Sequence, residues 1–116
     1  MRIDKFTQKM QEAVQAAQNL ASDFNQQEIT NEHFLLALLD QGEGVTTPLL
    51  EKMGVQTNEL RTQLRAEVER RPRITGGNVD QRIGNDLRSV LDGAEKEMAK
   101  LKDEFVSAEH YLLALT

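Results

Sequence analysis

An all-helical fold, arranged as a pseudo-twofold duplicated helical bundle, is predicted by three features of this 116-residue sequence. Apolar residues recur at steps of three and four, which is the spacing of amphipathic helices. The pattern of the first 38 residues returns 77 positions later. The second copy runs only to Thr116, so we expect it to be truncated, with the first two of the four helices of the first copy.

Length and composition restrict the class of protein. The chain suits one domain, and its 14 Lys and Arg against 19 Asp and Glu give a net charge of -5. This charge argues against sequence-independent binding to nucleic acid or to an anionic membrane. Without cysteine there is no disulfide and no thiolate metal site, and no stretch approaches the roughly 20 apolar residues of a membrane span. We therefore expect a cytoplasmic protein with protein partners, and neither nucleic acid nor membrane.

The first repeat is expected over residues 1–71 with four helices. A long amphipathic helix carries the apolar stripe that begins at Phe6, and Thr30 is the expected N-cap of a short helix over residues 31–39. The remaining two helices are marked by their ends. Thr47 and Pro48 are typical of an N-cap and a first helical position, Gly54 ends that helix, and Thr57 caps the last helix, which ends at Arg70 and Arg71 before Pro72.

Residues 72–81 are expected to form a linker, and residues 82–116 the second repeat. Under the 77-residue shift, residues 29–38 fall on residues 106–115 with like-for-like exchanges except at Asn31. Every apolar stripe position of the first helix also meets an apolar residue. The stripe is Phe6, Met10, Ala13, Val14, Ala17, Ala21 and Phe24, and its counterparts are Ile83, Leu87, Val90, Leu91, Ala94, Met98 and Leu101.

The sequence contains no recognisable catalytic machinery, and we expect this segment to be a binding module and not an enzyme. Phosphate-loop, dinucleotide-binding, zinc-protease and CxxC motifs are all missing. His33 and His110 each follow a glutamate, which raises a metal site as one possibility. Such a site requires three or four converging ligands, so packing or hydrogen bonding at the start of a buried helix is the favoured interpretation.

Glu32 and Glu109 are the paired positions of greatest interest. Each lies in the first turn of an apolar helix, and we expect each to lie near the start of the neighbouring long helix, at Thr7 in the first unit. One interpretation is stabilisation of the helix dipole. The other is a carboxylate that receives a cationic group of a bound segment, while backbone donors at the helix start receive an anionic one. The two are compatible.

Several segments together resemble the Clp N-terminal domain over all 116 residues. They are Asp4-Lys5-Phe6-Thr7, the doubled Glu-His-(Phe/Tyr)-Leu-Leu-Ala-Leu, Thr47-Pro48-Leu49-Leu50 and Leu101-Lys102-Asp103-Glu104-Phe105-Val106. The last segment and the Arg-Arg-Pro-Arg-Ile-Thr-Gly-Gly linker look closest to the ClpB disaggregase branch. The resemblance implies the N-terminal domain of a hexameric AAA+ ATPase that collects unfolded or aggregated proteins, in cooperation with an Hsp70 system. ATP and Mg²⁺ would belong to ATPase modules outside this segment, for which no cofactor is expected.

The resemblance also implies a set of site residues. Thr7, Asp103 and Glu109 match positions that bind clients in the family, and in ClpC-like relatives the equivalents of Glu32 and Glu109 contact phosphorylated arginine. This sequence has Gly84 where the second unit would match Thr7. We therefore expect client binding at Thr7, Glu32, Asp103 and Glu109. Two alternatives stay open: a ClpA- or ClpC-type domain that binds adaptors or phosphoarginine clients, and an architectural cap on the ring.

Overall fold

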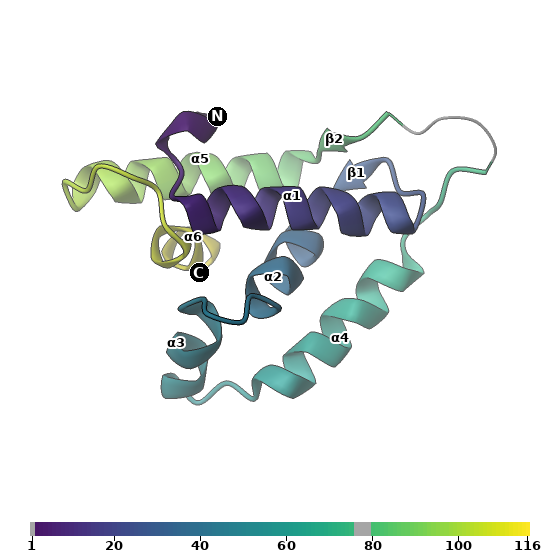
Figure 1. The fold of residues 1–116 in the computed structure, drawn as a ribbon, viewed down its shortest axis with the longest axis horizontal. Helices are drawn as coiled ribbons and strands as arrows, with labels where there is room; N and C mark the ends of the chain where they lie inside the picture. The colour runs from purple at the N-terminus through teal and green to yellow at the C-terminus, as the bar shows by residue number, and fades with distance from the viewer. Residues whose placement is uncertain (1, 76–79) are drawn as a thin grey trace.

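The computed structural model describes residues 2–75 and 80–116, and within them the chain is almost entirely helical (Figure 1). This confirms the predicted all-helical fold class. Among the described residues, four α-helices precede residues 72–81 and two follow them, and a short 3-10 helix lies at Ile3–Lys5. The glycine pair at the centre of the expected linker lies outside the described residues. The α-helices are α1 (Gln8–Asp23), α2 (Asn31–Leu39), α3 (Thr46–Lys52), α4 (Thr57–Arg70), α5 (Asn85–Lys100) and α6 (Ala108–Leu115).

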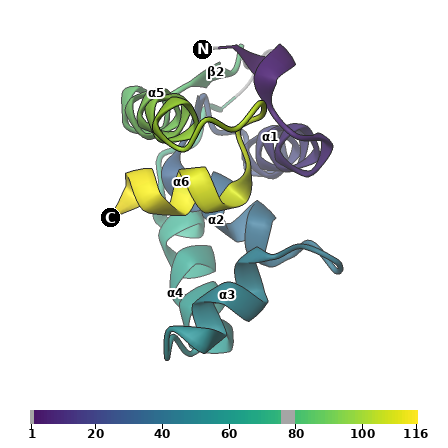
Figure 2. The same ribbon diagram turned by 90° about the vertical axis from the view of Figure 1, so that its left-hand side faces the viewer.

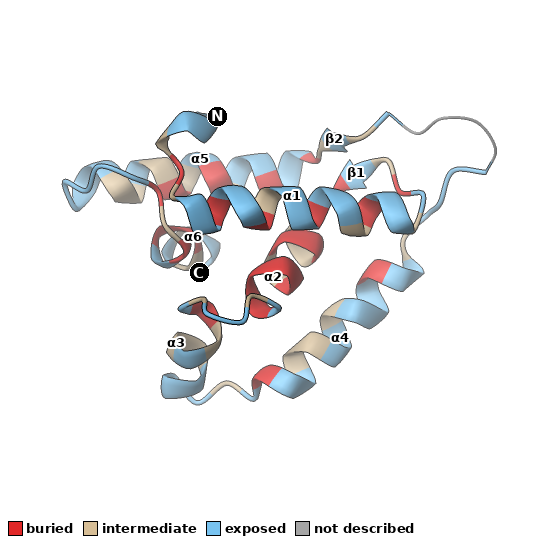
Figure 3. Ribbon diagram, viewed as in Figure 1, coloured by how far each residue is buried: buried red, intermediate tan, exposed pale blue. Residues whose placement is uncertain are grey.

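The helices form layers around one core. The long helices α1 and α5 make one layer, α2 and α6 lie beneath it, and α3 and α4 lie beyond α2 (Figures 1 and 2). The predicted stripes face inward (Figure 3). Val14 and Val90 are partly buried, and the fully buried positions are Met10, Ala13, Ala17, Ala21, Leu87, Leu91 and Ala94. The stripes end at the helix ends, because Phe24 is only half-buried and Leu101 is 56% exposed. Among the described residues, no helix is both long and apolar enough to cross a membrane.

Two predicted helix starts differ from the structure, by two residues for α3 and by one residue for α4. Helix α3 begins at Thr46, and the Thr47 hydroxyl donates to the Leu39 carbonyl at the end of α2. Thr57 is the first residue of α4, and its hydroxyl donates to the Glu51 carboxylate of α3. Both hydroxyls therefore join neighbouring helices, which sequence spacing alone does not reveal. The predicted end at Gly54 is confirmed, since its φ of 89° is the left-handed conformation that glycine favours after a helix.

Backbone hydrogen bonds join the two repeats, and each bond runs from the start of a long helix in one repeat to the segment before the short helix of the other. Strand β1 (Glu28–Ile29), just before α2, pairs in parallel with β2 (Arg82–Ile83), just before α5, and the Gly84 N–H donates to the Ile29 carbonyl over 2.9 Å. The equivalent contact has the repeats reversed, because the Thr7 N–H donates to the Val106 carbonyl, also over 2.9 Å. The start of each long helix thus lies against the short helix of the other repeat, which is the arrangement of a pseudo-twofold pair.

The exception at Asn31 has a structural cause. Phe34 and Tyr111 occupy equivalent positions and pack against each other in the core, with ring centroids 4.7 Å apart and ring planes tilted by 56°. Only Tyr111 carries a hydroxyl, and this group donates to Asn31 Oδ1 over 2.8 Å. The equivalent of Asn31 is Ala108, and the equivalent of Tyr111 is Phe34, whose ring has no hydroxyl to donate. The two departures from the repeat therefore compensate each other.

Tyr111→Phe is expected to lower the free energy of unfolding by about 1 kcal/mol, because the half-buried Asn31 amide loses its partner. Asn31→Ala would leave the buried hydroxyl unpaired at a similar or larger cost. Urea denaturation of the single and double variants measures the coupling between them. The double variant is expected to cost less than the sum of the singles, and simple additivity would contradict this pairing.

Candidate functional site

The Glu32 carboxylate forms an ion pair with another residue of the same chain. It lies half-buried in the first turn of α2, and its Oε2 accepts from Arg71 Nη2 over 3.0 Å. Burial alone would raise the pKa of this carboxyl, but its own backbone N–H, the Thr30 hydroxyl and the Arg71 guanidinium together hold the pKa below the ordinary value. Arg71 follows α4, so this ion pair fastens the end of α4 to the start of α2.

Arg71→Gln is expected to raise the pKa of Glu32, because the change removes both a charge and a hydrogen bond. A carboxyl whose folded pKa is lowered contributes stability above its unfolded pKa, and this contribution is lost as the pH falls through the folded value. Carbon-detected NMR titration of the Glu32 carboxyl measures the shift. Arg70→Gln is the matched control, since Arg70 pairs with Glu67 instead. An unchanged Glu32 pKa in Arg71→Gln would show that the ion pair is absent in solution.

Glu109 occupies the equivalent position in α6 in a different setting. Its side chain is exposed, and among the described residues it takes part in no ion pair. It lies at the edge of an apolar groove between α6 and the α3–α4 pair. The carboxylate is therefore available to a cation brought by another molecule, whereas that of Glu32 is not.

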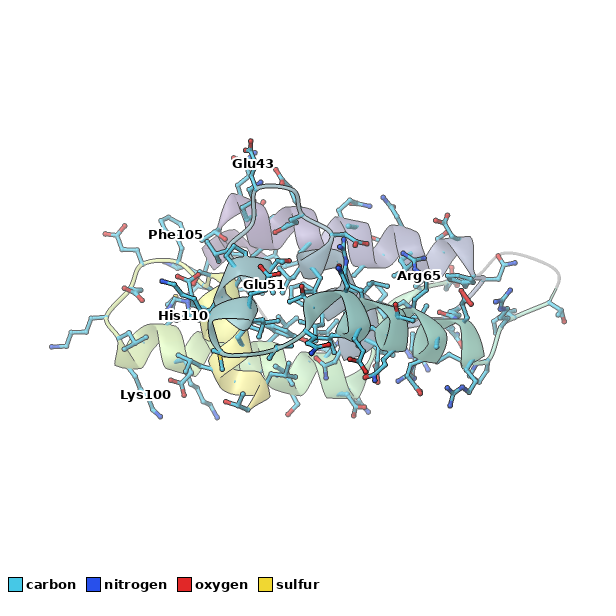
Figure 4. The ribbon with its side chains drawn as sticks, turned by 90° about the horizontal axis from the view of Figure 1, so that it is seen from below. Glu43, Glu51, Arg65, Lys100, Phe105 and His110 are labelled. Carbon is cyan, nitrogen blue, oxygen red and sulfur yellow. The ribbon has the colours of Figure 1, made fainter. Side chains whose placement is uncertain are left out.

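The groove beside Glu109 has a volume of about 500 Å³ and is lined almost entirely by aliphatic side chains. Three of them are well exposed, with Met53 at 65%, Leu113 at 51% and Leu115 at 37%. Figure 4 views the molecule from the side of α3, α4 and α6. Exposed apolar surface that is gathered in one groove, with an acid at its edge, is typical of a site that binds protein segments. The full lining is Leu35, Leu49, Leu50, Met53, Val55, Leu60, Glu109, Leu112, Leu113, Leu115 and Thr116.

Asp103 is held by His110 (labelled in Figure 4). The Ser107 backbone N–H donates to Nδ1 of the buried imidazole over 2.8 Å, so the neutral ring carries its proton on Nε2, which lies 2.8 Å from Asp103 Oδ2. The Asp103 side chain is nevertheless 52% exposed. One of its oxygens is therefore fixed by the fold, and the carboxylate still faces solvent.

His33 forms the equivalent network in the first repeat, with a different partner. Its Nδ1 accepts from the Thr30 N–H over 3.0 Å, and its Nε2 lies 2.6 Å from Gln26 Oε1. Gln26 Nε2 in turn donates to the Val68 carbonyl of α4 over 2.6 Å. Burial, with Arg71 nearby, lowers the pKa of His33 to about 4. Both histidines thus hydrogen-bond at a helix start, as favoured from the sequence, and the described residues contain no cluster of three or more metal-ligating side chains.

Thr7 caps α1, since its hydroxyl accepts from the Met10 N–H over 3.2 Å. Its own N–H donates to Val106, so Thr7, Asp103 and Glu109 all belong to the junction between the start of α1 and the start of α6. Glu32 lies at the other junction, beside the start of α5. The expectation that Glu32 lies near Thr7 in its own unit is therefore wrong, because the repeats exchange their backbone pairs.

Sequence reasoning missed two features of this surface. The sequence indicates only that Arg70 and Arg71 end a helix, yet Arg71 also neutralises one of the two paired acids. The groove residues of α3 and α4 were not singled out, because their spacing gives no sign that one side of the pair stays open. Leu113 is exposed whereas its counterpart Leu36 is buried, because among the described residues the second repeat has no counterpart of α4.

Together these features describe a small helical domain made of two repeats, with an apolar groove between α6 and the α3–α4 pair and the exposed Glu109 at its edge. The chain belongs to the family described as the Clp repeat (R) N-terminal domain, whose model matches residues 5–116.

Curated relatives from several bacteria are named chaperone protein ClpB. That of Porphyromonas gingivalis is 36% identical over 115 residues, and that of Rhodopirellula baltica is 39% identical over 114 residues. These matches cover 99% and 98% of this chain but 13% of each relative, so the chain spans about an eighth of their length. The chain is therefore similar to one segment of ClpB chaperones.

Solved structures agree in fold. The N-terminal domain (1-163) of the ClpV1 ATPase from E. coli has a TM-score of 0.89 at 26% identity, and the match covers 97% of this chain and 68% of that one. The Hsp104 N-terminal domain from Candida albicans has a TM-score of 0.85 at 22% identity, with 96% and 73% covered. The second likeness concerns the fold alone. The fold is thus shared by N-terminal domains of differently named proteins.

Proposed function

We propose that this domain is the substrate-recognition module of a ClpB-type ATP-dependent chaperone, which binds unfolded or aggregated proteins and delivers them to an AAA+ ring. The observation that supports this most is the apolar groove with Glu109 at its edge. In this proposal the ATPase modules, with their ATP and Mg²⁺, belong to the remainder of a longer protein. That protein works as a cytoplasmic homohexamer with an Hsp70 system.

Apolar contact in the groove supplies affinity for clients, and the acids select among them. A single shallow surface gives dissociation constants of roughly micromolar or weaker, about -8 kcal/mol, and a ring of such domains raises the overall strength through avidity. Unfolded chains expose apolar side chains beside lysine and arginine, which is the combination that Leu113 and Glu109 suit.

Phosphoarginine recognition is less well supported by the geometry at the first acid. Arg71 already occupies the Glu32 carboxylate, so a guanidinium from another molecule would have to displace it. The matching helix start, at Gly84, also lacks the hydroxyl that Thr7 has at the other junction. We therefore favour clients that carry ordinary basic residues.

The test is NMR chemical-shift mapping of the domain with a permanently unfolded protein. We expect shifts around Thr7, Asp103, Glu109 and the groove. An absence of shifts there would instead favour an architectural cap that makes no contact with clients.

Glu109→Ala is expected to weaken this binding about three- to tenfold while lowering the free energy of unfolding by less than about 1 kcal/mol, because the side chain is an exposed first-turn acid. Glu43→Ala, in the exposed loop before α3 (Figure 4), is the matched control. A large fall in melting temperature for Glu109→Ala would show that the acid serves mainly to stabilise α6.

A further inference from the structure

Three arginines line a small pocket where the end of α4 meets β1 and β2, at the end of the domain opposite α6 (Figure 1). The pocket has a volume of about 220 Å³, and its lining comes entirely from residues 26–82. Of the described residues that line it, Glu28 is the one acid. Three arginines against one glutamate leave a net charge of +2 here, in a chain whose total is -5. The pocket is therefore a basic site on an acidic domain.

Arg73 is held in place by an aromatic ring and a carbonyl. Its guanidinium lies over the Phe24 ring at the end of α1, 4.8 Å from the ring centre, and its Nη2 donates to the Glu69 carbonyl over 3.5 Å. The backbone beside it is fixed as well, because the Ile74 N–H donates to the Asn25 carbonyl over 2.8 Å. Among the described residues no carboxylate pairs with Arg73, so its charge is positioned but not neutralised.

The other two arginines of the pocket differ in how far their charges are neutralised. Arg71 pairs with the half-buried Glu32 over 3.0 Å, so little of its charge is left for another molecule. Arg82 is the first residue of β2, and its guanidinium lies 3.5 Å from the Glu28 carboxylate with 61% of the side chain exposed. An exposed pair of this kind contributes little free energy and is easily exchanged. Arg73 and Arg82 are therefore the cations that a ligand can use.

Apolar surface lies beside these cations, because Pro72 and Ile74 also line the pocket and Ile74 is 39% exposed. Pockets for drug-sized ligands measure roughly 300–1,000 Å³. The volume of 220 Å³ here therefore suits a single side chain and not a nucleotide. Arginine matches carboxylates through paired hydrogen bonds. The chemistry that fits is one apolar side chain with a carboxylate on either side.

We propose that this pocket binds an acidic segment of a partner protein, in which one apolar side chain enters beside Ile74 and flanking Asp or Glu carboxylates pair with Arg73 and Arg82. A nucleic acid fits less well, because the Phe24 face on which a base could stack is covered by Arg73. The pocket is opposite in charge to the acid at Glu109, so the two surfaces select opposite kinds of segment. This inference therefore goes beyond the proposed client recognition and is independent of it.

The test uses a fluorescein-labelled peptide, Gly-Glu-Asp-Leu-Asp-Glu-Gly, and measures its binding to the 116-residue chain by anisotropy at low salt. Arg73→Gln and Arg82→Gln are each expected to weaken binding about fivefold, because each removes one charged contact. Ile74→Ser is expected to weaken it roughly threefold through lost apolar contact. The matched control is Arg65→Gln (labelled in Figure 4), an exposed arginine of α4 outside the pocket lining, which is expected to bind as the unchanged protein does.

Circular dichroism of each variant verifies that the domain stays folded. Equal binding by the unchanged protein and a double variant, Arg73→Gln with Arg82→Gln, would overturn the proposal. So would equal affinity for an oligothymidylate of the same charge, which would mean that the pocket attracts any polyanion. Equal affinity for a peptide with serine in place of leucine would show that no apolar side chain enters, and would overturn it too. Binding of an unfolded client without binding of the acidic peptide would leave the proposed function standing and remove this inference alone.

Discussion

His33→Ala is expected to lower the free energy of unfolding by about 3 kcal/mol near neutral pH. The imidazole is fully buried and bridges the Thr30 N–H to the Gln26 amide, which itself holds the Val68 carbonyl of α4. Its removal leaves a cavity and two buried polar groups without partners, and each of these effects costs one to several kcal/mol. Urea denaturation measures the loss.

The cost of His33→Ala is also expected to shrink as the pH falls. The ordinary pKa of 6.5 is lowered to about 4 in the folded protein, so unfolding takes up a proton between these values. A neutral imidazole therefore contributes its full stability above pH 6.5 and loses it as the pH falls towards 4, by about 3 kcal/mol in total. Stability curves of the two proteins at pH 7 and pH 4 measure the difference.

The repeat provides the control. His110→Ala removes an equally buried ring whose partner, Asp103, is half exposed and can turn to water, so we expect a smaller cost near neutral pH. A His33→Ala cost that stays constant from pH 7 to pH 4 would mean that the folded protein accommodates the charged ring, in conflict with its burial and with the Arg71 cation nearby.

The helices that recur in both repeats could be predicted from the sequence. The spacing of Met10, Ala13, Ala17 and Ala21 predicted the buried stripe of α1, and the 77-residue shift transferred it to α5. Thr30 was correctly predicted as an N-cap, because a cap and its helix are local in sequence. Local patterns of this kind are determined by neighbouring residues and need no knowledge of the tertiary structure.

The predictions that were wrong or missing concern contacts between residues that are distant in the sequence. Two repeats with one pattern cannot indicate whether Thr7 lies beside its own short helix or the other one, because either pairing satisfies the same stripe. Arg71 has an adequate local role at a helix end, so its ion pair with Glu32 needed the packing of α4 on α2. Asn31, the exception to the repeat within residues 29–38, was a non-local signal, because its hydrogen bond to Tyr111 joins the two repeats.

Leu36→Ala and Leu113→Ala are expected to differ strongly although they change equivalent residues. Leu36 is 1% exposed beneath α4, and its truncation leaves a cavity in a packed interface, at a cost of about 3 kcal/mol. Leu113 is 51% exposed in the open groove, so its truncation is expected to cost less than about 0.5 kcal/mol. Urea denaturation of both variants gives the two values under identical conditions.

Equal costs for the two variants would mean that α6 is covered in solution, for example by self-association, and dilution would then separate them. Unequal costs would instead leave Leu113 free for binding, since a side chain that contributes little to folding can contribute to a partner's affinity. The same variant pair then distinguishes stability from recognition: Leu36→Ala weakens the domain, while Leu113→Ala weakens client binding in a domain that remains stable. The comparison is internally controlled, because the two leucines hold equivalent positions of the repeat and differ in that α4 buries one of them.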